Sequence, residues 1–301
     1  HSSFRKKLDK DFDARNDKYS TAATDNLVEI LIDSNLNKSN LNLERLHGWN
    51  NCLFEHTQYS KLNKIDIAKF RIHSDMEVVS GAIGHEKVHY KAIPVEKIYE
   101  DIENFLKYCN ESSENIYIKA AIVHIWFVII HPYDDGNGRI ARAITDYILS
   151  KNSSNTEFKL YSISTAINKD RKAYYDILDK TTNLFLNKDF DLTPWLIWHL
   201  NILNNAMKQS LINIEYFIQK TKFWDKHRSK ALNERQIKVL NKMLDMGNEN
   251  FEGELNTKKY ISLTKVSKAT AVRDITALVE FGCIKQIDGT AGRNVRYEIK
   301  F

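Results

Sequence analysis

The chain has 301 residues, of which 43% are hydrophobic and 28% charged, and this composition excludes a chain dominated by disorder. It is long enough for two or three domains. Because only 3 prolines and 10 glycines occur, the sequence disfavours an all-β fold and predicts a mainly α fold of long helices. The whole net charge of +5 lies in residues 257–301, which hold nine basic and four acidic residues.

The N-terminal region is predicted to be helical. Apolar residues between Leu27 and Leu46 follow a helical period, broken by the polar stretch 34–42, so two helical pieces are expected. At Met76 the pattern changes to strand, glycine-containing turn and strand, which predicts a β-hairpin over 76–91. Helical periodicity then returns in four segments: 95–109, 116–130, 139–149 and 191–230.

The longest apolar run, 116–130, is interrupted by Lys119 and His124 and is shorter than the roughly 20 residues that span a bilayer. We expect a buried core helix, no membrane partner and, since no secretory leader pattern precedes it, a cytoplasmic location. The cysteines lack the spacing of a disulfide framework or a zinc site: Cys52, Cys109 and Cys283.

The C-terminal segment is predicted to be a separate unit. Three helical stretches precede two short strands, the order of a winged helix-turn-helix: 232–246, 257–263, 267–280, 283–288 and 295–300. The basic charge favours duplex DNA as a partner. Against this, Asp274 and Glu280 on the third helix would repel phosphate, so a protein-contact role stays open.

One motif concentrates reactive groups between two predicted helices: His-Pro-Tyr-Asp-Asp-Gly-Asn-Gly-Arg-Ile-Ala-Arg, residues 131–142. Gly136, Asn137 and Gly138 precede a helix, where backbone N–H groups form an anion site that suits phosphate. Arg139 and Arg142 share a face of that helix and can bind phosphate oxygens.

Two further residues of the motif suit phosphoryl chemistry. Asp135 can hold Mg²⁺, which prefers a carboxylate together with substrate phosphate oxygens. His131 is a suitable general base for a hydroxyl. A zinc hydrolase, a P-loop protein and a protein kinase are disfavoured, because their ligand spacing and signature motifs are missing from the sequence.

The motif resembles the signature of the Fic (filamentation induced by cyclic AMP) family, H-x-F-x-[DE]-G-N-G-R-x-x-R, with Tyr133 in place of Phe. The hairpin resembles the family's flap, and the tail resembles the winged helix of bacterial members. The resemblance implies a Fic-type helical bundle with a β-hairpin flap and a C-terminal winged helix-turn-helix domain. The implied domains are a regulatory-like region 1–60, a catalytic core 61–230 and a C-terminal domain 231–301.

The resemblance also implies a protein adenylyltransferase that transfers AMP from ATP to a Ser, Thr or Tyr hydroxyl of a target protein or of itself. His131 would be the base, Asp135 the Mg²⁺ ligand, and Tyr133 a buried anchor. ATP phosphates would bind the residues Gly136, Asn137, Gly138, Arg139 and Arg142. Tyr174 and Tyr175 are candidates for adenine contact, with core packing the favoured role for at least one of them. The flap would dock the target through Val79, Ser80, Gly81, Ala82, Ile83 and Gly84.

Related proteins with an N-terminal regulatory helix carry an inhibitory Glu, and Asn37 occupies that place in this chain. Since an amide binds the Arg142 guanidinium less strongly than a carboxylate does, we expect appreciable basal activity and suppression by Asn37→Glu. Another acid, such as Glu29 or Glu44, is the alternative inhibitory residue.

Two other functions stay open. A Doc-like transfer of another phosphate-containing group is disfavoured because Gly138 replaces the Lys that is usual in that branch. A DNA-binding regulator with an ATP-sensing core is the other alternative. The sequence does not decide the oligomeric state, for which a homodimer is one alternative.

Overall fold

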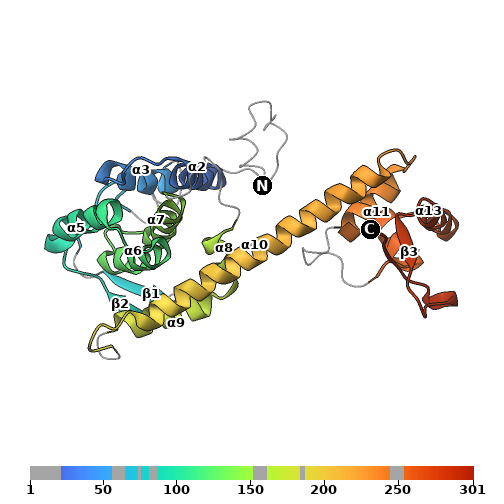
Figure 1. Ribbon diagram of the computed structural model, residues 1–301. Coiled ribbons are helices and arrows are strands. Elements are labelled where there is room, and N and C mark those ends of the chain that lie inside the picture. The colour runs from blue at the N-terminus through green and yellow to red at the C-terminus, as the bar shows by residue number, and fades with distance from the viewer. Residues whose placement is uncertain are drawn as a thin grey trace. The chain divides into compact units, whose positions relative to one another are not determined.

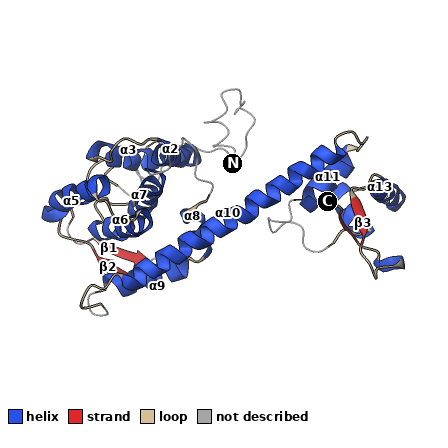
Figure 2. Cartoon of the chain, in the orientation of Figure 1, coloured by secondary structure: helices blue, strands red, loops and turns tan. Residues whose placement is uncertain are grey.

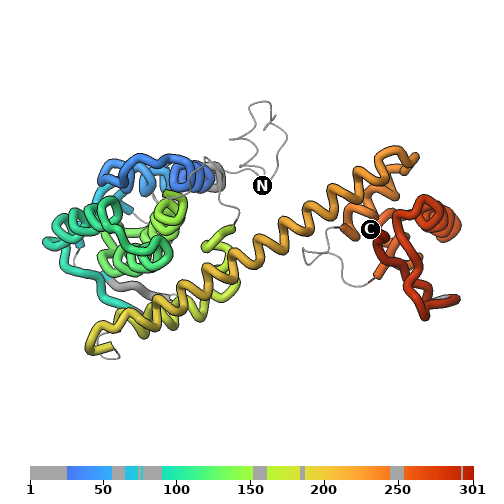
Figure 3. The backbone as a smooth tube through the Cα atoms, in the orientation of Figure 1, coloured from blue at the N-terminus to red at the C-terminus, as the bar shows by residue number. Residues whose placement is uncertain are grey.

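The computed structural model describes residues 22–55, 65–73, 76–80, 87–151, 161–183, 187–244 and 254–301. The chain forms two compact units, residues 1–207 and 208–301, which are described separately below (Figure 1). Their boundary falls within one long helix, α10 (Thr193–His227), which Figure 3 shows as a continuous tube. The predicted mainly α fold is confirmed (Figure 2). None of the helices in the described ranges is long and apolar enough to cross a membrane.

Unit 1 is built around α6 (Ile116–Ile130), which has the bounds that the apolar run predicts. It is apolar on nearly all sides, as expected of a helix at the centre of a core. Around it the unit contains α2 (Ala22–Leu36), α3 (Leu43–Phe54), α5 (Ile98–Glu111), α7 (Asn137–Lys151), α8 (Ile163–Lys169), α9 (Arg171–Thr182) and the first part of α10. Its core includes the fully buried side chains Phe105, Phe127, Tyr147 and Trp195.

The predicted hairpin is confirmed. Strand β1 (Glu77–Ser80) pairs antiparallel with β2 (Lys87–Lys91), with an irregularity between Val78 and Val79. Of the expected flap residues, Val79 and Ser80 belong to β1, whereas Gly81, Ala82, Ile83 and Gly84 lie outside the described residues. After β2 the chain enters a short 3-10 helix, Val95–Lys97, that leads into α5.

Unit 2 has its own apolar core, which includes Val239, Leu240, Tyr260 and Leu278. Its helices are the last part of α10, α11 (Glu234–Leu244), α12 (Thr257–Thr264) and α13 (Lys268–Glu280). Strand β3 (Ile284–Gln286) pairs antiparallel with β4 (Tyr297–Ile299). The winged-helix identity of this unit stays a prediction.

Asp274 does not lie on the surface of unit 2, and the expectation that it repels phosphate there is wrong. Its side chain is 7% exposed and accepts hydrogen bonds from the Tyr260 hydroxyl at 2.9 Å and from Arg235 Nε at 3.0 Å. A buried carboxylate needs such partners to offset its lost hydration. Asp274 therefore joins α11, α12 and α13 in the interior, and only Glu280 of the two acids is exposed.

Candidate active site

The motif forms the connection between two helices that pack against each other, α6 and α7. His131 ends α6 in a left-handed conformation, with φ 48° and ψ 57°, and its N–H donates to the carbonyl of Phe127 at 3.0 Å. Non-glycine residues adopt this conformation at a cost of about 1 kcal/mol or more, so surrounding contacts must hold it. The chain then turns and begins α7 at Asn137.

The imidazole of His131 is half-buried and held in one orientation. Its Nδ1 lies 3.2 Å from the carbonyl oxygen of Val128, which can only accept, so Nδ1 carries the proton. Nε2 then has a free lone pair and no hydrogen-bond partner within the described ranges. Burial lowers the pKa of His131 to about 4, with a further lowering by the charge of Arg71. At neutral pH the ring is therefore uncharged, with Nε2 free of a proton and able to act as a base.

The start of α7 offers unpaired donors. Gly136 has φ +89°, and its carbonyl accepts the first helical N–H groups, those of Arg139 and Ile140, both at 3.0 Å. The N–H groups of Asn137 and Gly138 precede these bonds and have no partner in the part of the chain that is described. Such N–H groups at the positive end of a helix form an anion site.

Arg142 adds a positive charge near this site. Its half-buried guanidinium makes no hydrogen bond or ion pair within the described ranges, and burial lowers its pKa. A cation that is partly removed from water without a partner favours an anionic ligand.

The side chain of Asn137 has a different partner from the expected phosphate. Its Nδ2 donates to the Tyr133 carbonyl at 2.7 Å, and its Oδ1 accepts the Tyr133 N–H at 3.0 Å. The amide is 2% exposed. The side chain of Asn137 therefore stabilises the loop, and its backbone N–H remains as a donor to a ligand.

Asp135 and Arg139 form an ion pair one helical turn apart, with 3.4 Å between Oδ1 and Nη2. Arg139 also lies over the ring of Phe54, 4.8 Å from its centroid. The second carboxylate oxygen of Asp135 has no partner among the described residues, and both side chains are more than a third exposed. A partly exposed carboxylate with one free oxygen fits a hard cation such as Mg²⁺.

Tyr133 is fully buried, as expected. Its ring packs against Phe70 and Phe127, and its hydroxyl lies 3.0 Å from Nδ1 of His47. The Fic signature that this motif resembles has Phe at this position, so the hydroxyl of Tyr133 is a polar group that the signature residue lacks. His47, on α3, satisfies it.

Of the two adenine candidates, Tyr174 is a core residue. It is 6% exposed, its hydroxyl lies 3.2 Å from Nε2 of the buried His124, and burial raises its pKa to about 12. Tyr175 is half-buried beside it, with 5.4 Å between the ring centroids. Tyr175 is therefore the better candidate for contact with a base.

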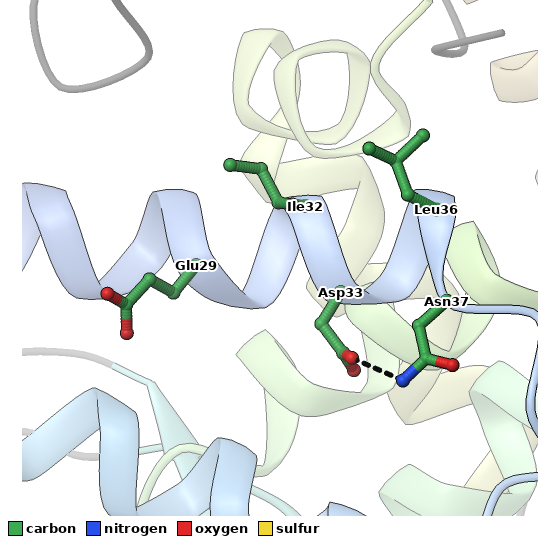
Figure 4. A pocket seen from close by; sticks show the side chains of 5 residues that line it. All are labelled: Glu29, Ile32, Asp33, Leu36 and Asn37. Atoms are coloured by element: carbon green, nitrogen blue, oxygen red, sulfur yellow. Dashed lines mark hydrogen bonds between the residues drawn. The ribbon is translucent and has the colours of Figure 1, made fainter. Parts of the chain in front are cut away.

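Asn37 follows the end of α2 and is exposed. Its Nδ2 donates to Oδ1 of Asp33 at 2.7 Å, as Figure 4 shows. Asp33 also accepts bonds from Arg45 Nε at 2.7 Å and Trp49 Nε1 at 2.8 Å. The structure thus joins Asn37 to the connection between α2 and α3 and not to Arg142, and its regulatory role stays a prediction.

Two residues that the sequence does not single out hold the motif in place. Arg71 is 1% exposed, and its Nε donates to the carbonyl of His131 at 2.8 Å. Asn50 is fully buried; its Nδ2 donates to the Asp135 carbonyl at 3.2 Å, and its Oδ1 accepts the Ala68 N–H at 2.9 Å. Neither residue belongs to a periodic pattern, and each lies at least 60 residues from its partner in the motif.

We expect Gly136→Ala to disrupt the loop and Gly138→Ala to leave the fold intact. A Cβ at Gly136 would lie 2.9 Å from Leu53 Cδ1 and 3.0 Å from Phe54 Cε2, at a positive φ. Among the described residues, a Cβ at Gly138 would meet only Arg142 Nη1, at an ordinary 3.6 Å. Thermal unfolding should show Gly136→Ala destabilised by about 1–3 kcal/mol and Gly138→Ala within about 1 kcal/mol of the parent. Equal stability of the two variants would contradict this assignment.

Comparison with known proteins agrees with the motif. Residues 40–149 match the model of the Fic/DOC family. A probable protein adenylyltransferase of Aquifex aeolicus is 38% identical over 58 residues, a match that spans 19% of this chain and 18% of that protein.

Two solved structures are similar at low sequence identity. A Fic family protein from Desulfovibrio desulfuricans G20 is 16% identical, with a TM-score of 0.49 over 93% of this chain and 76% of that one. A Fic domain containing signaling protein from Bacteroides thetaiotaomicron is 18% identical, with a TM-score of 0.47 over 63% of this chain and 68% of that one. The family match covers residues 40–149, which include the whole motif 131–142, so this part of the chain is similar to the Fic/DOC family.

Proposed function

We propose that this chain is a protein adenylyltransferase that transfers AMP from ATP to a hydroxyl group of a protein. The observation that carries the proposal is a set of groups, in one loop and the helix after it, that have no partners among the described residues. These groups are a proton acceptor, Nε2 of His131, and anion donors, the N–H groups of Asn137 and Gly138 with the guanidinium of Arg142. Their chemistry matches a hydroxyl nucleophile and a polyphosphate.

In the proposed reaction, Nε2 of His131 takes the proton of the target hydroxyl as its oxygen attacks the α-phosphorus of ATP. The bond from that phosphorus to the bridging oxygen of the β-phosphate breaks, and pyrophosphate leaves. The N–H groups at the start of α7 and the guanidinium of Arg142 stabilise the phosphate charge. The hairpin β1–β2 would hold the target backbone by strand addition and so fix the position of the hydroxyl.

Asp135 would hold Mg²⁺ through its free carboxylate oxygen. When bound with ATP, the ion would neutralise charge on the phosphates. Arg139, which pairs with Asp135, would keep that carboxylate in position next to the anion site.

The proposal is tested by incubating the protein with ATP labelled at the α or the γ phosphate, with and without cell lysate. Label that enters protein from the α position alone supports AMP transfer. Label from the γ position alone would instead establish phosphorylation, the Doc-like alternative. The name of the Aquifex aeolicus relative supports the first outcome, although its match covers only 58 residues.

A second candidate function, duplex DNA binding by unit 2, gains support from the burial of Asp274. With that carboxylate inside, the exposed residues of α13 include Lys268 and Arg273. We expect weak binding whose affinity falls steeply with salt, and a further loss on replacing both residues by Ala. Titration of labelled duplex at several salt concentrations checks this. Lys97→Ala in unit 1 is the control for loss of a positive charge outside the proposed DNA-binding surface. Binding that does not depend on salt would contradict the prediction.

A further inference from the structure

Arg71 is a buried cation whose guanidinium is bonded to backbone carbonyls. Nε donates to the carbonyl of His131 at 2.8 Å, Nη1 to that of His73 at 2.7 Å, and Nη2 to that of Ile93. The side chain is 1% exposed and forms no ion pair within the described ranges. Because a buried charge is costly unless every donor is satisfied, these carbonyls must stay in place around it.

Two of the backbone groups bonded to Arg71 belong to the catalytic loop. Besides the bond to His131, the backbone N–H of Arg71 donates to the carbonyl of Pro132 at 2.9 Å. Consecutive carbonyls of the loop thus bind one residue. These bonds hold the left-handed conformation of His131, which directs its imidazole.

Another of these carbonyls belongs to the chain that leaves the hairpin. Ala92 still pairs with the hairpin, since its N–H donates to the Met76 carbonyl at 2.9 Å, and Ile93 is the next residue. The guanidinium of Arg71 therefore contacts the exit of β2 and the carbonyl of the catalytic histidine at once.

We propose that Arg71 is a positioning residue that couples the β1–β2 hairpin to His131. It acts through backbone carbonyls and does not touch the substrate. The inference rests on the proposed function, in which the hairpin places the target hydroxyl and His131 takes its proton. With one rigid group between them, the distance from the docked hydroxyl to Nε2 is set before the target binds.

The experiment compares Arg71→Lys and Arg71→Met with Arg45→Lys. Lysine keeps the charge but loses the planar fork, and methionine keeps the length without the charge. Arg45 is a matched control, because its guanidinium also binds backbone carbonyls, those of Ser39 at 2.8 Å and Asp33 at 2.9 Å, away from His131. Thermal unfolding establishes which variants are folded.

The first readout is self-modification of the full chain with α-labelled ATP. We expect both Arg71 variants to lower kcat about 10- to 100-fold, with the KM for ATP unchanged within about twofold, because the phosphate donors lie on α7. Arg45→Lys should not lower kcat. An unchanged kcat in Arg71→Lys, or an equal loss in Arg45→Lys, would overturn the proposal.

The second readout, hydrogen–deuterium exchange, does not depend on AMP transfer. In either Arg71 variant, peptides covering 87–93 and 127–136 should both exchange faster, whereas Arg45→Lys should change neither. Faster exchange in one of the two peptides alone, or loss of folding in both Arg71 variants, would reduce Arg71 to a structural residue. If the parent chain transfers no AMP, the proposed function is wrong. The exchange data would still show whether Arg71 couples the hairpin to the loop of His131.

Discussion

Replacing His131 with alanine is expected to lower AMP transfer by about 10²- to 10⁴-fold, the usual contribution of a general base. Nε2 of His131 has no protein partner in the described ranges, and burial keeps the pKa of the ring at about 4, so the base is unprotonated at neutral pH. ATP should still bind, because the N–H groups of Asn137 and Gly138 do not depend on the imidazole.

The measurement is the rate of label transfer from α-labelled ATP, together with the ATP dissociation constant from calorimetry. His73→Ala is the control, since it removes an exposed imidazole of the neighbouring segment and keeps the carbonyl that Arg71 binds. A rate within a few-fold of the parent for His131→Ala would show that another group takes the proton.

The second large effect that we expect is a loss of stability at acidic pH. Unit 1 should lose stability as the pH falls from about 6.5 towards 4, because two of its fully buried histidines resist protonation. Burial lowers the pKa of His199 to about 4, and within the described parts of the chain neither ring nitrogen of His199 has a hydrogen-bond partner. Burial also lowers the pKa of His124, with contributions from the charges of His199 and Arg142.

The sign of this pH dependence follows from proton binding in the folded and unfolded states. Below about pH 6.5 the unfolded chain protonates these rings while the folded chain does not, so protons favour unfolding. The stabilisation by the uncharged rings is complete at pH values above their pKa in the unfolded chain. It is lost as the pH falls towards their pKa in the folded chain. Each ring contributes a slope of up to about 1.4 kcal/mol per pH unit.

Denaturant unfolding at several pH values checks this. His199→Phe removes one titrating ring and two unsatisfied nitrogen atoms, so its unfolding free energy should depend less on pH than that of the parent. His73→Phe, at an exposed position, is the control for replacing a histidine by phenylalanine. Parallel pH profiles for the parent and His199→Phe would contradict the assignment.

The sequence predicted the features that repeat or cluster locally. The longest apolar run predicted the bounds of α6, and the change of period at Met76 predicted the hairpin. The motif brings together its reactive groups within twelve residues, so its His, Asp, Gly and Arg residues could be recognised before the fold was known.

The supports of the site could not be recognised in this way. Arg71 and His47 reach the motif from 60 and 86 residues away, and a lone buried polar residue leaves no periodic signal. Tyr174 and Asp274 show the opposite problem. The sequence suggests adenine contact for Tyr174 and phosphate repulsion for Asp274, whereas hydrogen bonds to His124 and Tyr260 hold the two side chains in the interior.

The side chain of Asn137 has a consequence for the entropy of binding. By accepting from the N–H of Tyr133 and donating to its carbonyl, the amide pairs with that residue as a neighbouring strand would. The loop is thereby ordered within the free protein, and a ligand does not have to restrict its backbone on arrival. The conformational entropy of the catalytic loop is therefore lost when the chain folds, and the interactions with the ligand contribute to affinity and to catalysis instead.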